Sequence, residues 1–311
     1  MRTEPKPEHG SPEWLRARQR DEHGSIRFGA SEAPTLMGVN PFGNLIDLFI
    51  EKMNPDPISI RSAAFHRGNL LEPVLVAEAG REYGFEPVVP EVMFVNGRLL
   101  ANLDGADHPT NPTQIIEAKT STFYDVAQPL PESYYWQAIA QLGTTEAEVV
   151  RVVCLDRRQT IGYWDVYRDE EGTAINRLFE RAEEIGGLFD AAKIPDEIRP
   201  TQEQINRLFP NPEGVRELSN DDLKIVRDWS AIKAELDLLE EKEKQLRDLV
   251  ATLIGEKEQA TYNGEAIVTY KTRKIGNRFD TTRFKAEMPD LYNTYTKDGG
   301  TTRVLRLTKG N

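Results

Sequence analysis

Two short segments of the sequence carry acidic and basic residues at spacings that suit metal-assisted chemistry. The first reads RLLANLDGAD and contains Asp104, and the second reads TQIIEAKTST and contains Glu117 and Lys119. If both segments are β-strands, side chains two residues apart point to the same face, so Glu117 and Lys119 lie together. If the strands are neighbours, Asp104 joins them from the end of the first strand.

These three side chains match the requirements of phosphodiester hydrolysis. Carboxylate and backbone carbonyl oxygens suit Mg²⁺, and a lysine beside them can orient or deprotonate a water molecule. Together they could assist the attack of water on a phosphodiester bond. An exposed strand edge with a solvated Glu and Lys is the alternative. The apolar neighbours Ile115 and Ile116 favour a functional site, because charges in a buried strand require compensation.

Two predicted helices carry further polar candidates. Glu72 lies in RGNLLEP, and a third carboxylate near the first two would be repelled unless a metal ion neutralised the group. A charge on a helix surface is the alternative for Glu72. Gln137 and Tyr135 lie early in the helix predicted from PESYYWQAIAQ, where they could position the site or contact DNA. Core packing is the alternative for the aromatic residue.

Hydrophobic periodicity predicts the elements that would position these residues. Small residues at Gly29, Ala30 and Ser31 indicate a tight turn from a strand into a helix, which Gly38 and Pro41 end. Residues 14–20 are predicted to start a helix. Further helices are predicted for 45–52, 66–83, 134–143 and 172–191. The predicted strands are 92–96, 99–104, 114–120, 149–155 and 163–168, and 54–60 is a predicted loop. This order predicts an α/β or α+β fold, with helices on both faces of a mixed central sheet.

Two of these elements allow a more detailed prediction. The run 149–155 is continuously apolar, as expected for a buried central strand, and Cys154 within it is expected to be a buried structural thiol. The 66–83 helix should bury one apolar face. The residues predicted for that face are Leu70, Leu71, Val74, Leu75 and Ala79.

After Pro200 the character of the sequence changes. One long amphipathic helix is predicted for 221–257, followed by a strand at 266–270, a short helix at 281–287 and a last strand at 303–307. The apolar stripe of the long helix is either core or a partner-binding face. A basic run in this region, which includes Lys271 and Lys274, could be a DNA track, and a solvated hairpin is the alternative. The stripe comprises Leu223, Val226, Trp229, Ile232, Leu236, Leu239, Leu246, Leu249 and Leu253.

Bulk composition narrows the class of protein. The chain has 311 residues, one cysteine and a net charge of −12, which argues against coating nucleic acid by bulk electrostatics but allows a DNA enzyme with a local basic surface. No stretch reaches the length of about 20 apolar residues that a membrane span needs. Residues 1–13 have no apolar signal region and are expected to be a disordered lead-in. A reducing cytoplasm is the expected location.

Six motifs, in order, resemble one family. They are WLRAR at 14–18, FGASEAPTLMGVNPF at 28–42, GNLLEP at 68–73, LDG at 103–105, IIEAK at 115–119 and YYWQ at 134–137. The ordered set resembles the YqaJ-type viral recombinase family, relatives of lambda-phage exonuclease within the PD-(D/E)xK nucleases. The resemblance spans about residues 14–165.

The resemblance implies both a fold and an activity. It implies a restriction-endonuclease-like nuclease domain at 14–200 and a C-terminal extension at 201–311. The implied activity is a Mg²⁺-dependent 5′-to-3′ exonuclease on the ends of linear double-stranded DNA, with two metal ions and Mn²⁺ as a substitute. Such an enzyme makes 3′ single-stranded tails for phage-type recombination in the bacterial cytoplasm. It works beside a single-strand annealing protein, and lambda-type relatives assemble as a trimeric ring.

The resemblance also implies roles for the residues at the matching positions. Metal binding is implied for Asp104, Glu117, Glu72 and the carbonyl of Ala118, and catalysis for Lys119 and Gln137. A second set would hold the terminal 5′-phosphate, namely Arg18 and Ser31. The stretch between these two residues is longer than usual, so Arg20 or Arg27 could take that role instead. Gln141 stands where a related motif has tyrosine, and no role is carried over to it.

Two other functions remain open from the sequence. An endonuclease or repair-type nuclease would use the same fold and site. A DNA-end-binding protein without turnover would keep the fold but not the chemistry.

Overall fold

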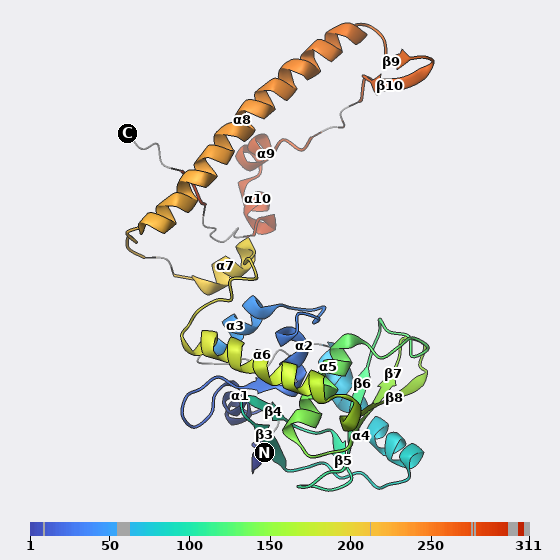
Figure 1. The fold of residues 1–311 in the computed structure, drawn as a ribbon. Coiled ribbons are helices and arrows are strands. Elements are labelled where there is room, and N and C mark those ends of the chain that lie inside the picture. Colours follow the sequence, from blue (N-terminus) through green and yellow to red (C-terminus); the bar gives the residue numbers. More distant parts are fainter. Residues whose placement is uncertain are drawn as a thin grey trace. The chain divides into compact units, whose positions relative to one another are not determined.

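The computed structural model describes residues 1–8, 10–54, 63–211, 213–274, 276, 278–297 and 304–307. The chain forms two compact units, Met1–Pro210 and Asn211–Asn311 (Figure 1). The first unit ends later than the predicted boundary at residue 200. Helix α7 (Gln202–Leu208) belongs to it, since Gln204 Nε2 donates to Asp47 Oδ2 at 2.9 Å and Arg207 forms an ion pair with the same carboxylate.

The first unit alternates helices and strands along the chain. Its helices are α1 (Pro12–Gln19), η1 (Ala30–Glu32), α2 (Ala33–Leu36), α3 (Leu45–Met53), α4 (Ala63–Tyr83), α5 (Glu132–Thr144), η2 (Arg168–Glu170), α6 (Gly172–Asp190) and α7. Its strands are β1 (Arg2–Pro5), β2 (Phe28–Gly29), β3 (Val92–Asn96), β4 (Leu99–Ala101), β5 (Gly105–Ala106), β6 (Gln114–Thr120), β7 (Val149–Leu155) and β8 (Ile161–Tyr167). The predicted loop at 54–60 lies, apart from Asn54, outside the described residues.

The strands of the first unit form two mixed sheets of four strands each. One has the order β5-β6-β7-β8, in which β6 and β7 are parallel and the other neighbours antiparallel. The other has the order β1-β3-β4-β2, in which only β2 and β4 are parallel. Strand β7 is central and mostly buried, as predicted, but it is not continuously apolar, because Arg151 within it pairs with Asp165 of β8. The predicted fold class, a mixed α/β architecture with flanking helices, is confirmed.

The predicted strand 99–104 is wrong at its end, and this changes how Asp104 reaches its neighbours. Strand β4 stops at Ala101, and the chain then crosses to the other sheet, where Gly105 and Ala106 of β5 pair with β6. Gly105 permits a close approach of α4, because a Cβ atom there would lie 2.7 Å from Val76 Cγ1. Asp104 therefore lies on the crossing between the sheets, directly before the short strand β5 that pairs with β6, and not at the end of β4.

The predicted disordered lead-in is also wrong. Residues Arg2–Pro5 form the edge strand β1, which pairs antiparallel with β3. Arg27 donates to both carboxylate oxygens of Glu4, at 2.8 and 2.6 Å, and tethers the strand from its side chain. An edge strand exposes one side to water, so its polar composition resembled that of a disordered segment.

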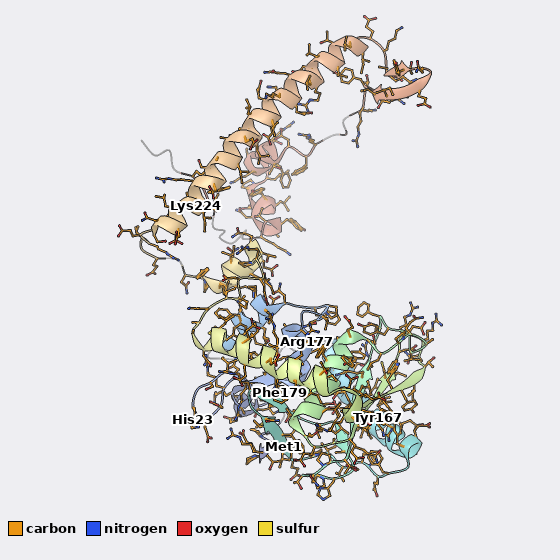
Figure 2. The ribbon with its side chains drawn as sticks, viewed as in Figure 1. Met1, His23, Tyr167, Arg177, Phe179 and Lys224 are labelled. Carbon is orange, nitrogen blue, oxygen red and sulfur yellow. The ribbon has the colours of Figure 1, made fainter. Side chains whose placement is uncertain are left out.

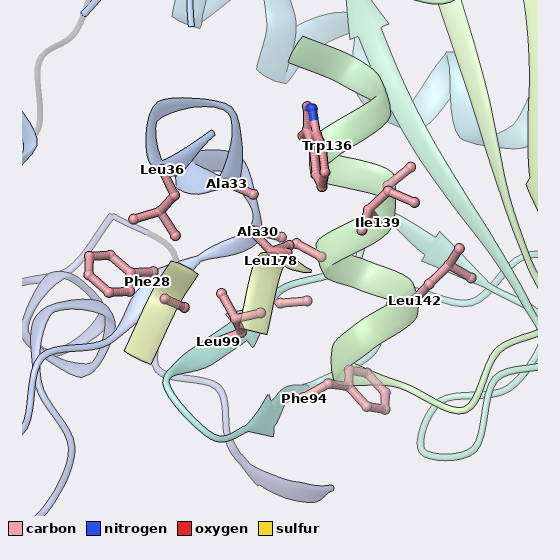
Figure 3. Close-up of a cluster of buried hydrophobic side chains, with 14 of the residues drawn as sticks. Phe28, Ala30, Ala33, Leu36, Phe94, Leu99, Trp136, Ile139, Leu142 and Leu178 are labelled. Atoms are coloured by element: carbon pink, nitrogen blue, oxygen red, sulfur yellow. The ribbon is translucent and has the colours of Figure 1, made fainter. Parts of the chain in front are cut away.

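The main core lies between α5 and the strands and helices that pack around it (Figure 3). Residues from β2, η1, α2, β3, β4, α5 and α6 meet here, which fixes α5 and its polar face relative to the sheets. Burial of each large apolar side chain contributes about 1.5–3 kcal/mol. The buried members labelled in the figure are Phe28, Ala30, Ala33, Leu36, Phe94, Leu99, Trp136, Ile139, Leu142 and Leu178. Cys154 is fully buried, as predicted, and burial raises the pKa of its thiol to about 11.

Helix α4 buries only part of the predicted stripe, since Leu75 and Ala79 are buried and Leu71 packs against them. Leu75, Val76 and Ala79 are buried against Ile116 and the rest of a smaller cluster on the β6–β7 surface. Two members of the predicted face are exposed, Leu70 at 63% and Val74 at 60%. A helix that covers a sheet with a single stripe leaves the flanking apolar positions in water.

The second unit contains α8 (Asn220–Ile254), the hairpin β9 (Gln259–Tyr262) and β10 (Glu265–Thr269), α9 (Thr281–Glu287) and α10 (Pro289–Tyr295). Positive φ angles at Asn263 and Gly264 form the tight turn of the hairpin. The predicted last strand is wrong in its described part, since residues 304–307 form no strand, and residue 303 lies outside the described residues. None of the helices in the described part of the chain has the length and apolar character that a membrane span requires.

Candidate active site

The side chains singled out from the sequence meet in one pocket of the first unit. A cavity of about 650 Å³ opens between η1, α4, β6 and α5. Its lining includes the residues Arg18, Ser31, Glu72, Asp104, Glu117, Ala118, Lys119 and Gln137. Segments more than a hundred residues apart in sequence, such as those of Arg18 and Gln137, therefore contribute to a single surface.

Glu117 is the centre of the pocket's hydrogen-bond network. It is buried, and its Oε1 accepts a hydrogen bond from Gln137 Nε2 at 2.6 Å. Lys119 Nζ lies 2.5 Å from the same oxygen, and Gln141 Nε2 donates to Oε2. The alternation of β6 puts Glu117 and Lys119 on one face, as the spacing predicts, and α5 packs over that face.

Lys119 is held as a charged donor. Its Nζ donates to Gln137 Oε1 at 2.9 Å and lies 5.7 Å from the centre of the Tyr134 ring. Burial by itself lowers the pKa of Lys119, but the charges of Glu117 and Asp104 outweigh it, and the net pKa is raised. In this arrangement the lysine is an ammonium that orients its neighbours.

The other two carboxyl groups are destabilised in their charged form. Ala118 N–H donates to Asp104 Oδ2 at 2.9 Å, so β6 holds this side chain through its backbone. Burial, and then the charges of Glu117 and Glu72, raise the pKa of Asp104 well above its ordinary range. The pKa of Glu72 is also raised, by burial and by the charge of Glu117. The pocket therefore concentrates three carboxyl groups around the ammonium group of Lys119.

This donor set suits a divalent cation. Within the described residues no three His, Cys, Asp or Glu side chains form a ready-made metal cluster. Both oxygens of Glu117 are instead engaged by Lys119, Gln137 and Gln141. The raised pKa values of Asp104 and Glu72 reflect a repulsion that a cation would relieve, and these carboxyl groups offer oxygen ligands, which Mg²⁺ and Mn²⁺ accept. The residues present fit such a metal.

Near α1 the pocket is lined by the guanidinium of Arg18 and the hydroxyl of Ser31. Arg18 Nη2 donates to Ser31 Oγ at 2.8 Å, and the guanidinium stacks 4.5 Å from the centre of the Trp14 ring. Gly29 makes room for it, because a Cβ atom there would lie 2.6 Å from Arg18 Nη2. The two residues that the family resemblance pairs are thus in direct contact.

A buried ion pair supports this part of the pocket from behind. Lys52 is almost fully buried, and its Nζ donates to the Arg18 carbonyl at 2.9 Å and lies 2.7 Å from Glu32 Oε2. Glu32 in turn accepts a hydrogen bond from Gly29 N–H at 2.8 Å and lies 3.9 Å from the Arg18 guanidinium. The network fixes the end of α1 relative to the turn that carries Ser31.

The comparisons with known proteins place this pocket in a named domain. Residues 13–148 match the YqaJ-like viral recombinase domain. The motif resemblance drawn from the sequence is thereby confirmed for that segment. Along most of its length the chain is also similar to a curated relative, "Uncharacterized protein YqaJ" of Bacillus subtilis (strain 168), with 23% identity over 305 residues that cover 92% of this chain and 91% of the relative.

Two solved structures are similar to part of the chain. One is an alkaline exonuclease (LHK-Exo) from Laribacter hongkongensis, with 20% identity and a TM-score of 0.47, covering 58% of this chain and 93% of that one. The other is a phage-related exonuclease from Haemophilus somnus 129PT, with 13% identity and a TM-score of 0.44, covering 54% of this chain and 95% of that one.

Two arginines proposed from the sequence lie outside the pocket of the YqaJ-like domain. Arg27 is 4% exposed and is committed to Glu4. Arg20 donates to the Gly24 carbonyl at 2.7 Å and closes the turn that follows α1. The extra residues between α1 and β2 fold into this small turn, bridged from Arg20 to Ile26. Of the three arginines, Arg18 lines the pocket and the other two do not, and which of them binds a phosphate stays a prediction.

Tyr135 also lies away from the pocket lining. Its hydroxyl hydrogen bonds to Glu171 Oε2 at 2.5 Å, and burial raises the pKa of this phenol. The predicted DNA contact through Tyr135 is therefore not supported by its position. Lys271 and Lys274 are exposed in the second unit, after β10, and their proposed DNA contact stays a prediction.

Sequence reasoning missed two members of the pocket region. Gln141 is fully buried one helical turn after Gln137 and binds the second oxygen of Glu117. The spacing of four residues was the available signal, since it puts both amides on one face of α5. Lys6 lines the pocket from the segment expected to be disordered, and its charge lowers the pKa of Glu72.

Proposed function

We propose that this chain is a deoxyribonuclease, a Mg²⁺-dependent 5′-to-3′ exonuclease that acts on the ends of linear double-stranded DNA. The observation that carries the proposal is the convergence of Asp104, Glu117, Lys119 and Gln137 in one pocket that also contains the Arg18–Ser31 pair. Hydrolysis of a phosphodiester needs a cation site, an oriented water and a grip on the substrate, and these groups can supply all three.

Asp104, Glu117, Glu72 and the Ala118 carbonyl are the proposed holders of the metal, with two Mg²⁺ ions or Mn²⁺ in their place. The bound metal would lower the pKa of water and stabilise the charge of the phosphate and of the leaving oxygen. The chain's own contribution is positional. Asp104 is fixed by Ala118 N–H, and Glu117 is fixed by Gln137 and Gln141.

Lys119 is proposed to orient the attacking water and the scissile phosphate by donation from its ammonium group. Gln137 Oε1 accepts a hydrogen bond from Lys119 Nζ, and this bond fixes the direction of the remaining N–H groups of the ammonium. Because the lysine is already charged, it needs no proton before it acts as a donor.

Arg18 and Ser31 are proposed to hold the terminal 5′-phosphate. A guanidinium binds phosphate oxygens with two parallel donors, and a hydroxyl adds a third. The pair lines the same pocket as the carboxylates, so a strand end gripped there would present its first phosphodiester to them. This arrangement makes cleavage depend on a DNA end.

The wider setting is also part of the proposal. The matched domain is described as a viral recombinase, and 3′ tails produced by 5′ resection are the substrate that strand annealing needs. We propose a single-strand annealing protein as partner, in a bacterial cytoplasm. A trimeric ring of the nuclease domain remains a prediction of the resemblance.

One degradation assay tests the activity. Linear duplexes with a 5′-phosphate or a 5′-hydroxyl, each labelled at the 5′ or the 3′ end, are incubated with and without Mg²⁺. We expect Mg²⁺-dependent release of mononucleotides from 5′ ends, faster with the 5′-phosphate. Loss of label from 3′ ends first, or equal rates without metal, would contradict the proposal.

A closed circular duplex separates the alternatives within the same assay. An end-dependent exonuclease leaves the circle intact, whereas an endonuclease of the same fold cuts it. Binding of duplex ends without any degradation, under all metal conditions, would instead support a DNA-end-binding protein.

A further inference from the structure

Helix α8 carries a continuous apolar seam on solvent-exposed positions. Reading Trp229 as position a of a heptad, all but one of the a and d positions from 225 to 253 are apolar, and only Glu243 interrupts the series. The exposed fractions of the aliphatic members run from 36% for Val250 to 85% for Leu253. The seam comprises Ile225, Trp229, Ile232, Leu236, Leu239, Leu246, Val250 and Leu253.

The length and spacing of this seam are those of a coiled-coil strand. The alternating steps of three and four residues keep the seam on one side of a supercoiled helix. The helix has 35 residues and is therefore about 52 Å long. Figure 2 shows its side chains projecting along its length, with Lys224 near its start. An exposed apolar surface of this extent marks a binding surface.

We propose that α8 pairs with α8 of a second copy of this chain in an antiparallel coiled coil. In the register that we assign, Leu236 lies opposite the partner's Leu239 at the centre of the pair. Trp229 then lies opposite the partner's Leu246. Between these two layers Ile232 lies opposite the partner's Glu243, and beyond them Ile225 lies opposite the partner's Val250.

The charges that flank the seam select this register. In an antiparallel pair, position e faces e and position g faces g. Lys233 therefore faces the partner's Glu240, and Glu235 faces the partner's Lys242, and the twofold symmetry repeats both contacts. All four are attractions between opposite charges, which set orientation and partner choice in coiled coils.

Other arrangements of the same two helices bring like charges together. In a parallel pair Glu235 faces the partner's Glu240, and Lys242 faces the partner's Arg247. A shift of the antiparallel pair by one heptad in one direction puts Glu240 against Glu240 and Lys242 against Lys242. A shift in the other direction opposes Glu235 to itself and Lys233 to itself.

Overlap of the helices favours the same register independently of charge. It places Asp221 opposite the partner's Ile254, so nearly the whole of α8 is paired. The two chains enter the pair from opposite ends, which attaches the two YqaJ-like domains at opposite ends of it. This pairing does not depend on the proposed nuclease activity.

A charge-reversal experiment on the full-length chain tests the pairing. The variant Lys233→Glu/Lys242→Glu makes the four flanking positions acidic, and Glu235→Lys/Glu240→Lys makes them basic. We expect each variant alone to dissociate more than tenfold more readily than the wild type in sedimentation equilibrium. An equimolar mixture should associate again. Equal association of the wild type and both variants, or a wild-type helix that never pairs, would overturn the proposal.

Orientation is tested by distances between spin labels. Cys154 is buried and stays unlabelled, so Ser230→Cys supplies a single labelled site on each α8. In the antiparallel register the two labels are about 22 Å apart along the axis, whereas parallel helices put them side by side about 10 Å apart. A label at Asp237→Cys, next to the twofold axis, should give a short distance in either orientation. Because the distances are local, association through the first unit does not mimic them.

The interruption at Glu243 provides a second test. Glu243→Leu should strengthen association by about tenfold, because a charged residue at a seam position helps to specify the register but makes the coiled coil less stable. Replacement at the exposed outer position Asp248→Leu should leave association unchanged. Weaker association of Glu243→Leu would contradict the assigned seam.

Discussion

The two units of this chain depart from ordinary burial in opposite ways. The first buries charge, since Glu117 and Lys52 are almost inaccessible and Lys119 is largely covered. The second exposes apolar surface, since the leucines of α8 face solvent. Buried charges and exposed leucines both carry a free-energy cost that folding alone does not remove. We propose that each cost is removed by binding, of a metal and DNA by the first surface and of a second helix by the other.

Because the first unit buries charge both in its pocket and behind it, some substitutions there should reduce activity without loss of the fold, and others should reduce stability. The largest expected effect is that of Lys119→Ala, which removes the ammonium group in contact with Glu117. Degradation of linear duplex should fall by about 10²–10⁴-fold, the range for loss of a positioned catalytic group. Initial rates at saturating DNA measure it, and far-UV circular dichroism confirms the fold. Unchanged rates would mean that the pocket has another role.

Gln141 tests whether the buried part of the network is structural. Gln141→Ala leaves one oxygen of Glu117 without its donor, and we expect the free energy of unfolding to fall by about 1–3 kcal/mol. Urea denaturation measures this. The exposed Gln128→Ala serves as the matched control, and its stability should match that of the wild type. Equal stability of both variants would show that water replaces the amide.

Arg18 tests the grip on the DNA end. We expect Arg18→Ala to reduce the preference for a 5′-phosphate over a 5′-hydroxyl by about tenfold, since a charge-assisted hydrogen bond contributes about 1.5–3 kcal/mol. Competition between the two duplexes measures the preference. Arg20→Ala, on the turn outside the pocket, is the control and should keep the wild-type preference. If Arg20→Ala lowered the preference and Arg18→Ala did not, the 5′-phosphate would be assigned to Arg20 instead.

The smallest expected effect concerns the edge strand β1. The hydrogen bond from Arg27 lowers the pKa of Glu4 below its ordinary value of 4.5. A lowered pKa in the folded state means that the pair stabilises the protein above that value and that the stabilisation is lost as the pH falls through the lowered pKa. Glu4→Gln should therefore reduce the free energy of unfolding by about 1 kcal/mol at pH 7 and by progressively less as the pH falls below 4.5. An equal reduction at all these pH values would assign the loss to packing instead of charge.

Some of this site could be derived from sequence because it depends on local geometry. The alternation of a strand puts Glu117 and Lys119 on one face wherever the strand lies. The helical period likewise puts Gln137 and Gln141 on one face of α5, although the sequence motifs pointed only to Gln137 as a site residue. Motif order added Arg18 and Ser31, whose contact the structure contains.

Other features could not be derived because they depend on which segments pack together. Asp104 reaches Ala118 by crossing between two sheets, and no local pattern distinguishes that path from a longer strand. The role of Arg27 depended on Glu4, in a segment whose polarity suggested disorder.

The sequence by itself determined the chemistry that this protein can perform, because residue types and strand or helix periods fix which groups share a face. Tertiary structure decided which of those groups meet. It placed Arg18 in the pocket lining and left Arg20 and Arg27 outside it, added Gln141 and Lys6, and left most of the leucines of α8 exposed to solvent. The physical reason is that burial and ion pairing depend on contacts between distant segments, and such contacts leave no periodic trace in the chain.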